Sequence, residues 1–153
     1  MQCYTDTPSA QGPENIPTLE LSLNGLSLPC QLDTGTSSRG TETALSINLA
    51  AFERIRDSLT FVEERTFSRT TDETKVQVYQ ARSEQGLQVS ACGETLRLER
   101  VIVQGPENGH PFSESGPYAL AGMSLIRQWR RVIVDPFGPC LWVQSRPVFP
   151  TDQ

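Results

Sequence analysis

The chain has a single histidine, His110, and its four cysteines form no Cys-x-x-Cys pair. Structural zinc sites are built from clustered cysteines and histidines, so this composition argues against a metal centre. The cysteines are widely separated, which favours buried thiols over disulfides. They are Cys3, Cys30, Cys92 and Cys140. We expect no metal and no other cofactor.

Long apolar runs are also missing, and the first residues have neither the basic nor the apolar region of a signal peptide. We therefore expect no membrane-spanning helix. Two locations stay open at this stage. The chain is cytoplasmic, or it is periplasmic or membrane-anchored if a targeting segment has been removed. In the second case Cys3 is a candidate for a lipid-bearing residue.

Excess basic charge is absent as well. The net charge is -5, which argues against a nucleic-acid-binding groove and against binding to an anionic membrane surface. A chain of 153 residues has the length of one ordinary domain with its own core. Residues 1–15 are polar and carry Pro8, Gly12 and Pro13, so they predict a flexible tail. We place the domain at residues 16–145 and a second tail at 146–153.

Asp33 stands at the end of a predicted hairpin. Residues 18–23 alternate apolar and polar side chains, and Asn24-Gly25 is a strong signal for a tight turn. Residues 26–32 return as the partner strand and lead directly into Asp33. Gly35 permits a sharp bend, and Thr34 and Thr36 bring hydroxyl groups near the carboxylate. This pattern is typical of a reactive carboxylate held at a strand end.

The remaining chain predicts one helix followed mostly by strands. Residues 43–59 have apolar side chains at helical spacing, and Ser46 is a candidate N-cap. Residues 104–117 are rich in glycine and proline and predict a loop, which exposes His110 to solvent. The other predicted elements are a strand pair at 60–66 and 75–81, a second pair at 87–91 and 95–103, a strand at 118–121, a short helix at 123–129, and a final hairpin at 132–134 and 141–143.

Two separated motifs carry a family resemblance. One is Asp33-Thr34-Gly35, and the other is Leu120-Ala121-Gly122 followed by Met123-Ser124-Leu125-Ile126. Their order resembles the retropepsin-like aspartic proteases (single-lobe, clan AA), including bacterial members. The resemblance spans about residues 16–145 and is specific at its two ends. It implies an all-β fold: a closed acid-protease-type barrel of one lobe, with one outer helix and a short C-terminal helix.

The resemblance also implies an activity. Enzymes of this kind hydrolyse peptide bonds with water, without a metal or a covalent intermediate, and need two carboxylates that share a proton. Asp33 would be the catalytic residue. The supporting residues would be Thr34, Gly35, Thr36, Leu120, Ala121 and Gly122. Since the chain has one Asp-Thr-Gly, the second carboxylate implies a homodimer acting on a peptide or protein substrate.

One feature departs from the family pattern. The strand pair at 60–66 and 75–81 would form the flap, the hairpin that closes over the substrate. Tyr79 is a candidate substrate contact within it. Its polar tip, 68–74, contains no glycine, whereas flaps usually carry glycine for close contact with the peptide. This departure keeps open an inactive peptide-binding or assembly module with the same fold. Asp-Thr-Gly-Thr also resembles the aspartyl-phosphate loop of cation-pumping ATPases, but the lysine that follows the Asp there is missing here.

Overall fold

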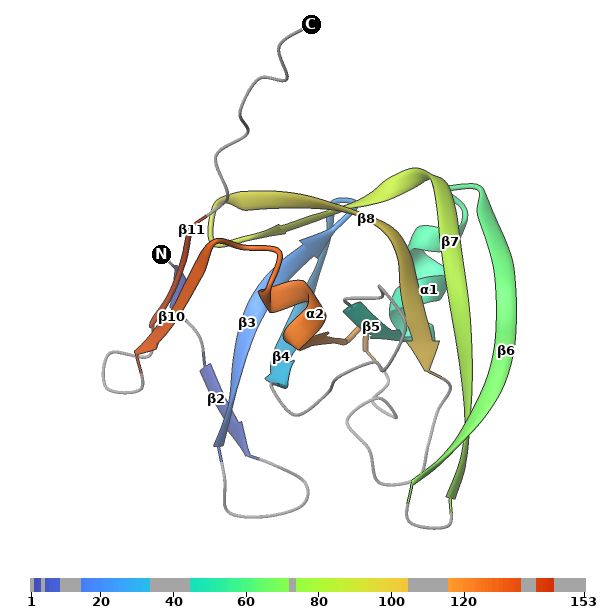
Figure 1. Ribbon diagram of the computed structural model, residues 1–153, viewed down its shortest axis with the longest axis horizontal. Helices are drawn as coiled ribbons and strands as arrows, with labels where there is room; N and C mark the ends of the chain where they lie inside the picture. Colours follow the sequence, from blue (N-terminus) through green and yellow to red (C-terminus); the bar gives the residue numbers. More distant parts are fainter. Residues whose placement is uncertain are drawn as a thin grey trace, which may run out of the picture.

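The computed structural model describes residues 2–3, 5–8, 15–33, 45–71, 74–104, 116–135 and 140–144, and most of them lie in strands (Figure 1). In chain order the elements are β1 (Gln2–Cys3), β2 (Thr5–Pro8), β3 (Asn15–Leu23), β4 (Leu26–Asp33), β5 (Leu45–Asn48), α1 (Leu49–Arg56), β6 (Phe61–Thr71), β7 (Thr74–Ala91), β8 (Glu94–Gln104), β9 (Ala119–Gly122), α2 (Met123–Ile126), β10 (Arg131–Asp135) and β11 (Cys140–Gln144). Among these residues no helix is long and apolar enough to cross a membrane.

Six strands close into a barrel in the order β3-β4-β9-β5-β8-β7, and β7 pairs back with β3. The closing contact is short, because only Ser22 and Leu23 of β3 pair with Ser90 and Val89 of β7. Two pairs, β4–β9 and β5–β8, are parallel, and the other pairs of the ring are antiparallel. Closure removes the exposed strand edges of an open sheet. The expected closed all-β barrel is confirmed.

Two tight turns connect barrel strands, one of them at Asn24-Gly25 as predicted. Asn24 and Gly25 join β3 to β4 with φ values of 49° and 84°, and Cys92 and Gly93 join β7 to β8 with 56° and 82°. In a two-residue hairpin, the turn whose twist matches that of the strands requires positive φ at both central residues. The Asn24 backbone N–H also donates to the Gln88 carbonyl at 2.8 Å, which links the first hairpin to β7.

The barrel is filled by aliphatic side chains that alternate along its strands. Leu19, Leu21 and Leu23 of β3 are all buried, while Glu20 between them is exposed. This is the period of two expected of a strand with one buried face. From the far side of the ring, Val101 and Val103 of β8 join the same core.

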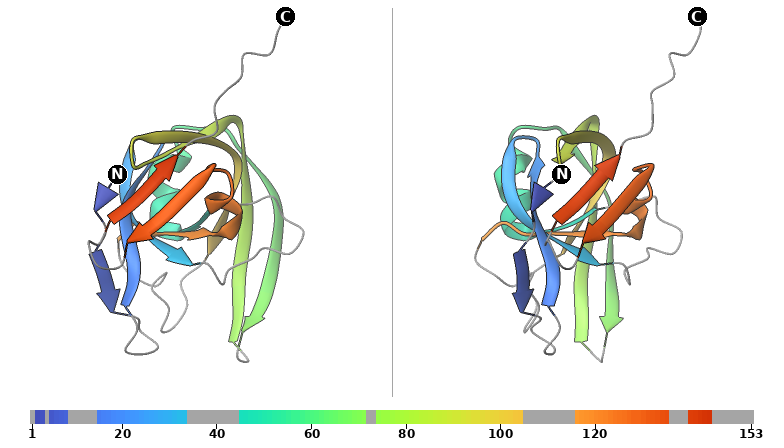
Figure 2. Two further views of the ribbon diagram at one scale, coloured as in Figure 1. Left: turned by 60° about the vertical axis from the view of Figure 1, so that its left-hand side comes forward. Right: turned by 90° about the vertical axis from the view of Figure 1, so that its left-hand side faces the viewer.

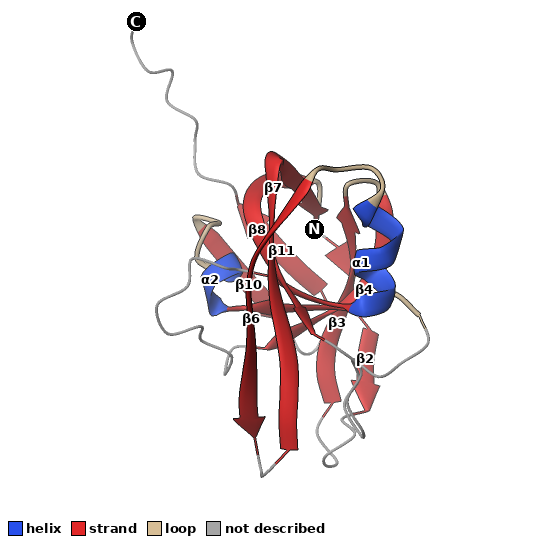
Figure 3. Cartoon of the chain, turned by 90° about the vertical axis from the view of Figure 1, so that its right-hand side faces the viewer, coloured by secondary structure: helices blue, strands red, loops and turns tan. Residues whose placement is uncertain are grey.

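The predicted helix at 43–59 is wrong in its first part. Residues 45–48 form β5, a strand buried along its whole length between β8 and β9, and α1 begins only at Leu49. Its N-cap is Asn48, not Ser46. Leu45 and Ile47 alternate with Ser46 and Asn48, but four residues are too few to distinguish this period from helical spacing that continues into α1. The helix itself packs Ala51 and Ile55 into the core and lies on the outside of the barrel (Figure 3).

β7 is one long strand where the sequence predicted two. It pairs with β6 from Thr74 to Ser83 and with β8 on both sides of a register shift between Arg82 and Leu87. Because β7–β8 pairing begins only at Val78, residues 68–71 and 74–77 form a two-stranded extension beyond the barrel. The predicted hairpin is therefore confirmed, and its pairing runs further into the predicted polar tip than expected.

A second, three-stranded sheet has the order β1-β11-β10 and joins the two ends of the chain (Figure 2). The predicted final hairpin is present as β10 and β11, and the turn between them lies outside the described residues. β1 and β2 fall inside the predicted N-terminal tail and were not foreseen. β1 pairs with β11, and β2 pairs with β3. The domain limits at 16 and 145 stay predictions.

Candidate active site

Asp33 is the last residue of β4, and it is half-buried. The three residues before it, Cys30, Gln31 and Leu32, are all buried, so the strand that carries the carboxylate is anchored in the barrel wall. β4 runs parallel to β9, and Asp33 is the Cα partner of Gly122. Asp33 and Gly122 are therefore neighbours although they are far apart in the sequence, and both strands end at the same end of the barrel.

The second predicted motif forms the neighbouring strand. Leu120 and Ala121 are buried and pair with Gln31 and Leu32 of β4. Gly122 is also buried, and its extended backbone forms the N-cap of α2, so the chain turns into this helix directly beside Asp33. The predicted helix at 123–129 is shorter in the structure, because α2 ends at Ile126.

A buried side-chain hydrogen bond ties the two segments together. The Tyr118 hydroxyl donates to Gln31 Oε1 at 2.8 Å, and both side chains are buried. Gln31 lies two residues before Asp33, and Tyr118 directly precedes β9. A buried hydroxyl that finds a carbonyl acceptor avoids the cost of an unsatisfied polar group. This hydrogen bond therefore helps to hold β4 and β9 in one register.

Asn48 is a positioning residue that sequence reasoning missed. Its Oδ1 accepts hydrogen bonds from the backbone N–H of Ala51 at 2.9 Å and of Tyr118 at 3.0 Å. Its Nδ2 donates to the Gly116 carbonyl at 2.7 Å, and its backbone N–H donates to the Tyr118 carbonyl at 3.0 Å. Asn48 thus caps α1 and fixes the chain entering β9. The available sequence signal was an Asn directly before a helix-forming run.

Replacing Asn48 with Ala is expected to lower the free energy of unfolding by roughly 2–4 kcal/mol, since it removes a helix cap and leaves buried backbone groups without partners. Urea denaturation of the two proteins measures the loss. Ser46→Ala is the matched control, because Ser46 is a buried polar residue of the same strand but is not the helix cap. Ser46→Ala should cost clearly less. Equal losses for both variants would contradict the assignment of Asn48 as the cap.

The other predicted site residues divide into two groups. Thr34, Gly35 and Thr36 lie outside the described residues, as does His110. Tyr79 is half-buried on β7, where it pairs with Thr66 of β6 and Val103 of β8 and packs against the core. The roles of all these residues stay predictions.

Two hairpin extensions flank the end of the barrel where β4 terminates. On one side, residues 15–17 of β3 pair with β2, and on the other, residues 68–71 of β6 pair with residues 74–77 of β7. Figures 1 and 2 show both extensions pointing to the same end of the molecule as the end of β4. The two extensions therefore continue past the end of β4, one on either side of Asp33.

A thiol, that of Cys30, also lies on β4, three residues before Asp33. Burial raises the pKa of the Cys30 thiol to about 12, although a hydrogen bond with the backbone of Ala121 acts in the opposite direction. A thiol with so high a pKa stays neutral at physiological pH and is a poor nucleophile. Within the described part of the chain, no group of three His, Cys, Asp or Glu residues is placed to hold a metal ion.

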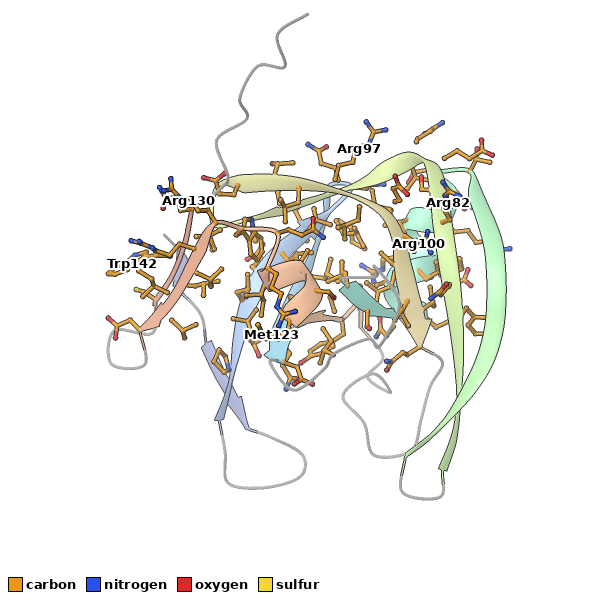
Figure 4. The ribbon with its side chains drawn as sticks, in the orientation of Figure 1. Arg82, Arg97, Arg100, Met123, Arg130 and Trp142 are labelled. Atoms are coloured by element: carbon orange, nitrogen blue, oxygen red, sulfur yellow. The ribbon has the colours of Figure 1, made fainter. Side chains whose placement is uncertain are left out.

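A separate cavity of about 640 Å³ lies at the opposite end of the barrel, where Figure 4 places Arg97. Its lining includes Asn24, Ser58, Gln85 and Arg97, and the described residues that line it include no carboxylate. It therefore offers no acid–base pair. The strand end at Asp33 is therefore the better candidate for a catalytic site.

Comparisons with known proteins bear on the fold. No family model matches the chain, and no curated protein matches it in sequence. The solved structures that are similar in fold include the following three. A retropepsin-like aspartic protease from Rickettsia conorii has 13% identity and a TM-score of 0.48, covering 88% of this chain and 83% of its own. EIAV protease in complex with the inhibitor HBY-793 has 16% identity and a TM-score of 0.45, covering 74% and 88%.

The third structure is the retroviral protease-like domain of Ddi1 from Leishmania major, with 11% identity and a TM-score of 0.51. The match covers 85% of this chain and 93% of that domain. At this identity the similarity establishes the fold alone. The chain therefore has the retropepsin-like fold expected from its two motifs.

Proposed function

We propose that this chain is an aspartic endopeptidase, in which the Asp33 carboxylates of two subunits activate water to hydrolyse peptide bonds. One carboxylate would act as the base toward water, and the other would protonate the carbonyl oxygen of the peptide. No metal or other cofactor enters this mechanism. Thr34, Gly35 and Thr36 would shape the loop around the carboxylate, and Leu120, Ala121 and Gly122 would support it from β9.

One observation carries the proposal. Asp33 belongs to the only Asp-Thr-Gly triplet in the sequence, and it ends a buried strand in parallel register with Gly122. This arrangement leaves a half-buried carboxylate at an open end of the barrel, and Asn48 and the Gln31–Tyr118 hydrogen bond fix the strands behind it. A catalytic carboxylate needs such rigid support, because small displacements of reacting groups reduce the rate.

A peptide substrate would bind as an extended strand beside Asp33. The β6–β7 extension continues past the barrel at this end and presents backbone groups that can pair with an added strand. Tyr79, at the base of the extension, would contact the substrate in this mode. The extension then takes the role of a flap that covers the peptide.

The proposed dimer needs an interface outside the barrel. Three of the large hydrophobic side chains that are exposed lie on the small sheet: Ile133 and Val134 of β10, each 43% exposed, and Trp142 of β11, 42% exposed. Ile133 and Trp142 are Cα partners, so they share one face. Contiguous exposed apolar surface is typical of a protein interface. This supports the face of the small sheet that carries Ile133 and Trp142 as the subunit contact.

Digestion of a peptide library at several pH values tests the proposal. The purified chain should release fragments with new peptide termini, and the rate should be highest at mildly acidic pH, where the carboxylate pair carries a single proton. Addition of a metal chelator should leave the rate unchanged. A folded protein that cleaves no peptide between acidic and neutral pH, or whose rate climbs steadily to about pH 9, would contradict the shared-proton mechanism.

The alternative is a catalytically inactive peptide-binding or assembly module. The absence of glycine from residues 68–74 favours it, because side chains at the tip restrict close backbone contact with a peptide. This module would bind extended peptides without cleaving them. The library digestion therefore separates the two functions, since fragments appear only with the protease.

A further inference from the structure

The two ends of the chain bring two cysteines to the same place. β1 pairs with β11 in antiparallel register, and Cys3 is the Cα partner of Cys140. Directly opposite residues of an antiparallel pair have Cα atoms roughly 4.5–5.5 Å apart, which falls within the range of about 4.4–6.8 Å found across disulfides. Cys3 and Cys140 are separated by almost the whole sequence, so spacing along the chain conceals this pair.

We propose that Cys3 and Cys140 form an intrachain disulfide that fastens β1 to β11. β1 contains only two residues and pairs with β11. So short a strand gains little from its own hydrogen bonds. A covalent bond at this register position would keep the N-terminal strand on the sheet. The proposal is independent of the protease activity.

Before two chains associate through this sheet, reagents in solution can reach this position. Cys140 is half-buried, and it lies two residues before Trp142 on the same strand, so the two side chains share a face of the sheet. Trp142 on that face is 42% exposed, and it lies at the outer side of the molecule in Figure 4. The bond would therefore form and open according to the redox state of the surroundings.

The other two thiols are poorer partners. Cys30 is completely buried in the barrel, and burial raises the pKa of its thiol to about 12. Cys92 occupies the turn between β7 and β8, and burial raises the pKa of its thiol as well. Strand pairing places neither of them opposite a cysteine.

Formation of the bond requires a disulfide oxidant, such as oxidised glutathione. The thiolate of one cysteine attacks a sulfur of the oxidant, forms a mixed disulfide and releases one glutathione thiolate. The thiolate of the second cysteine then attacks the protein sulfur of the mixed disulfide and releases the second glutathione thiolate. The two cysteines lose two electrons and two protons in total, and the oxidant is reduced to two thiols.

Peptide mapping without reduction tests the pairing. Combined cleavage after Glu and after Arg, except where Pro follows as at Arg146, separates the four cysteines into different peptides, with Cys3 in 1–14 and Cys140 in 132–153. After incubation of the native chain with oxidised glutathione, we expect a 1–14/132–153 conjugate that disappears on reduction. A conjugate containing Cys92 or Cys30 in place of either peptide, a disulfide-linked dimer, or complete alkylation of Cys3 and Cys140 would overturn the proposal.

Thermal unfolding gives a second readout. The disulfide would close nearly the whole chain into one loop, so the oxidised protein should have a Tm higher than the reduced protein by roughly 5–10 °C. Cys3→Ser and Cys140→Ser should each abolish this difference. Cys92→Ser is the matched control and should preserve it. A redox-dependent Tm that survives in Cys3→Ser or Cys140→Ser would contradict the assignment of the pair.

Discussion

Asp33→Asn is expected to reduce the rate of peptide cleavage by roughly 10³-fold or more, because it removes the ionisable group that acts as base and acid. The two side chains have nearly the same shape, so the variant should fold as the wild type does. The measurement compares initial rates for one cleavable peptide from the library. Circular dichroism and thermal unfolding of the same samples verify that the variant is folded.

Asp57→Asn is the matched control for this substitution. Asp57 is exposed at the C-cap of α1, away from the end of β4, and its change removes the same charge from the chain. Its rate should equal that of the wild type. Retained turnover in pure, folded Asp33→Asn protein would remove Asp33 from the mechanism. Equal losses in both variants would point to an effect of charge alone.

The parts of the fold that sequence reasoning predicted correctly are those fixed by local chemistry. Asn24-Gly25 adopts positive φ at both residues, as the two-residue turn requires, and the strands on either side follow the alternation of buried and exposed residues. Cys92-Gly93 is the same kind of case. Such signals depend on neighbours in sequence and survive in any tertiary context.

The errors arose where tertiary contacts decide the structure. Residues 45–48 read as the start of a helix, but they are buried between two strands and become β5. β1 and β2 are polar segments that become strands because β11 and β3 offer them partners. β11 lies far along the chain from β1, whereas β3 is the next strand after β2. Both segments are too polar for local propensity to predict a strand, so only the pairing itself reveals them.

The candidate site shows the same division. The position of Asp33 at a strand end followed from the hairpin pattern, and the structure confirms that position. The family resemblance predicted that Leu120-Ala121-Gly122 supports Asp33, but the parallel pairing of β4 with β9 was not predicted, since nothing local relates Asp33 to Gly122. Asn48 was missed because its importance lies in hydrogen bonds to Gly116 and Tyr118, far along the chain.

The central claim is that one active site needs Asp33 from two chains. A single Asp-Thr-Gly supplies one carboxylate, whereas the proposed mechanism uses one as base and one as acid. A two-fold axis between two copies of the Asp33 strand end would provide both, and twofold dimers are the commonest oligomers. An Asp33→Asn subunit should therefore inactivate any wild-type subunit with which it pairs.

Mixing the two proteins tests this claim most directly. Wild-type chain at fixed concentration is combined with a threefold excess of Asp33→Asn, and subunit exchange is verified by native mass spectrometry. With random pairing, only about a quarter of wild-type subunits keep a wild-type partner, so the rate should fall to about a quarter of its starting value. The same excess of Asp57→Asn should not lower it. A rate unchanged by exchanged Asp33→Asn subunits would show that each chain cleaves alone, and it would contradict the shared site.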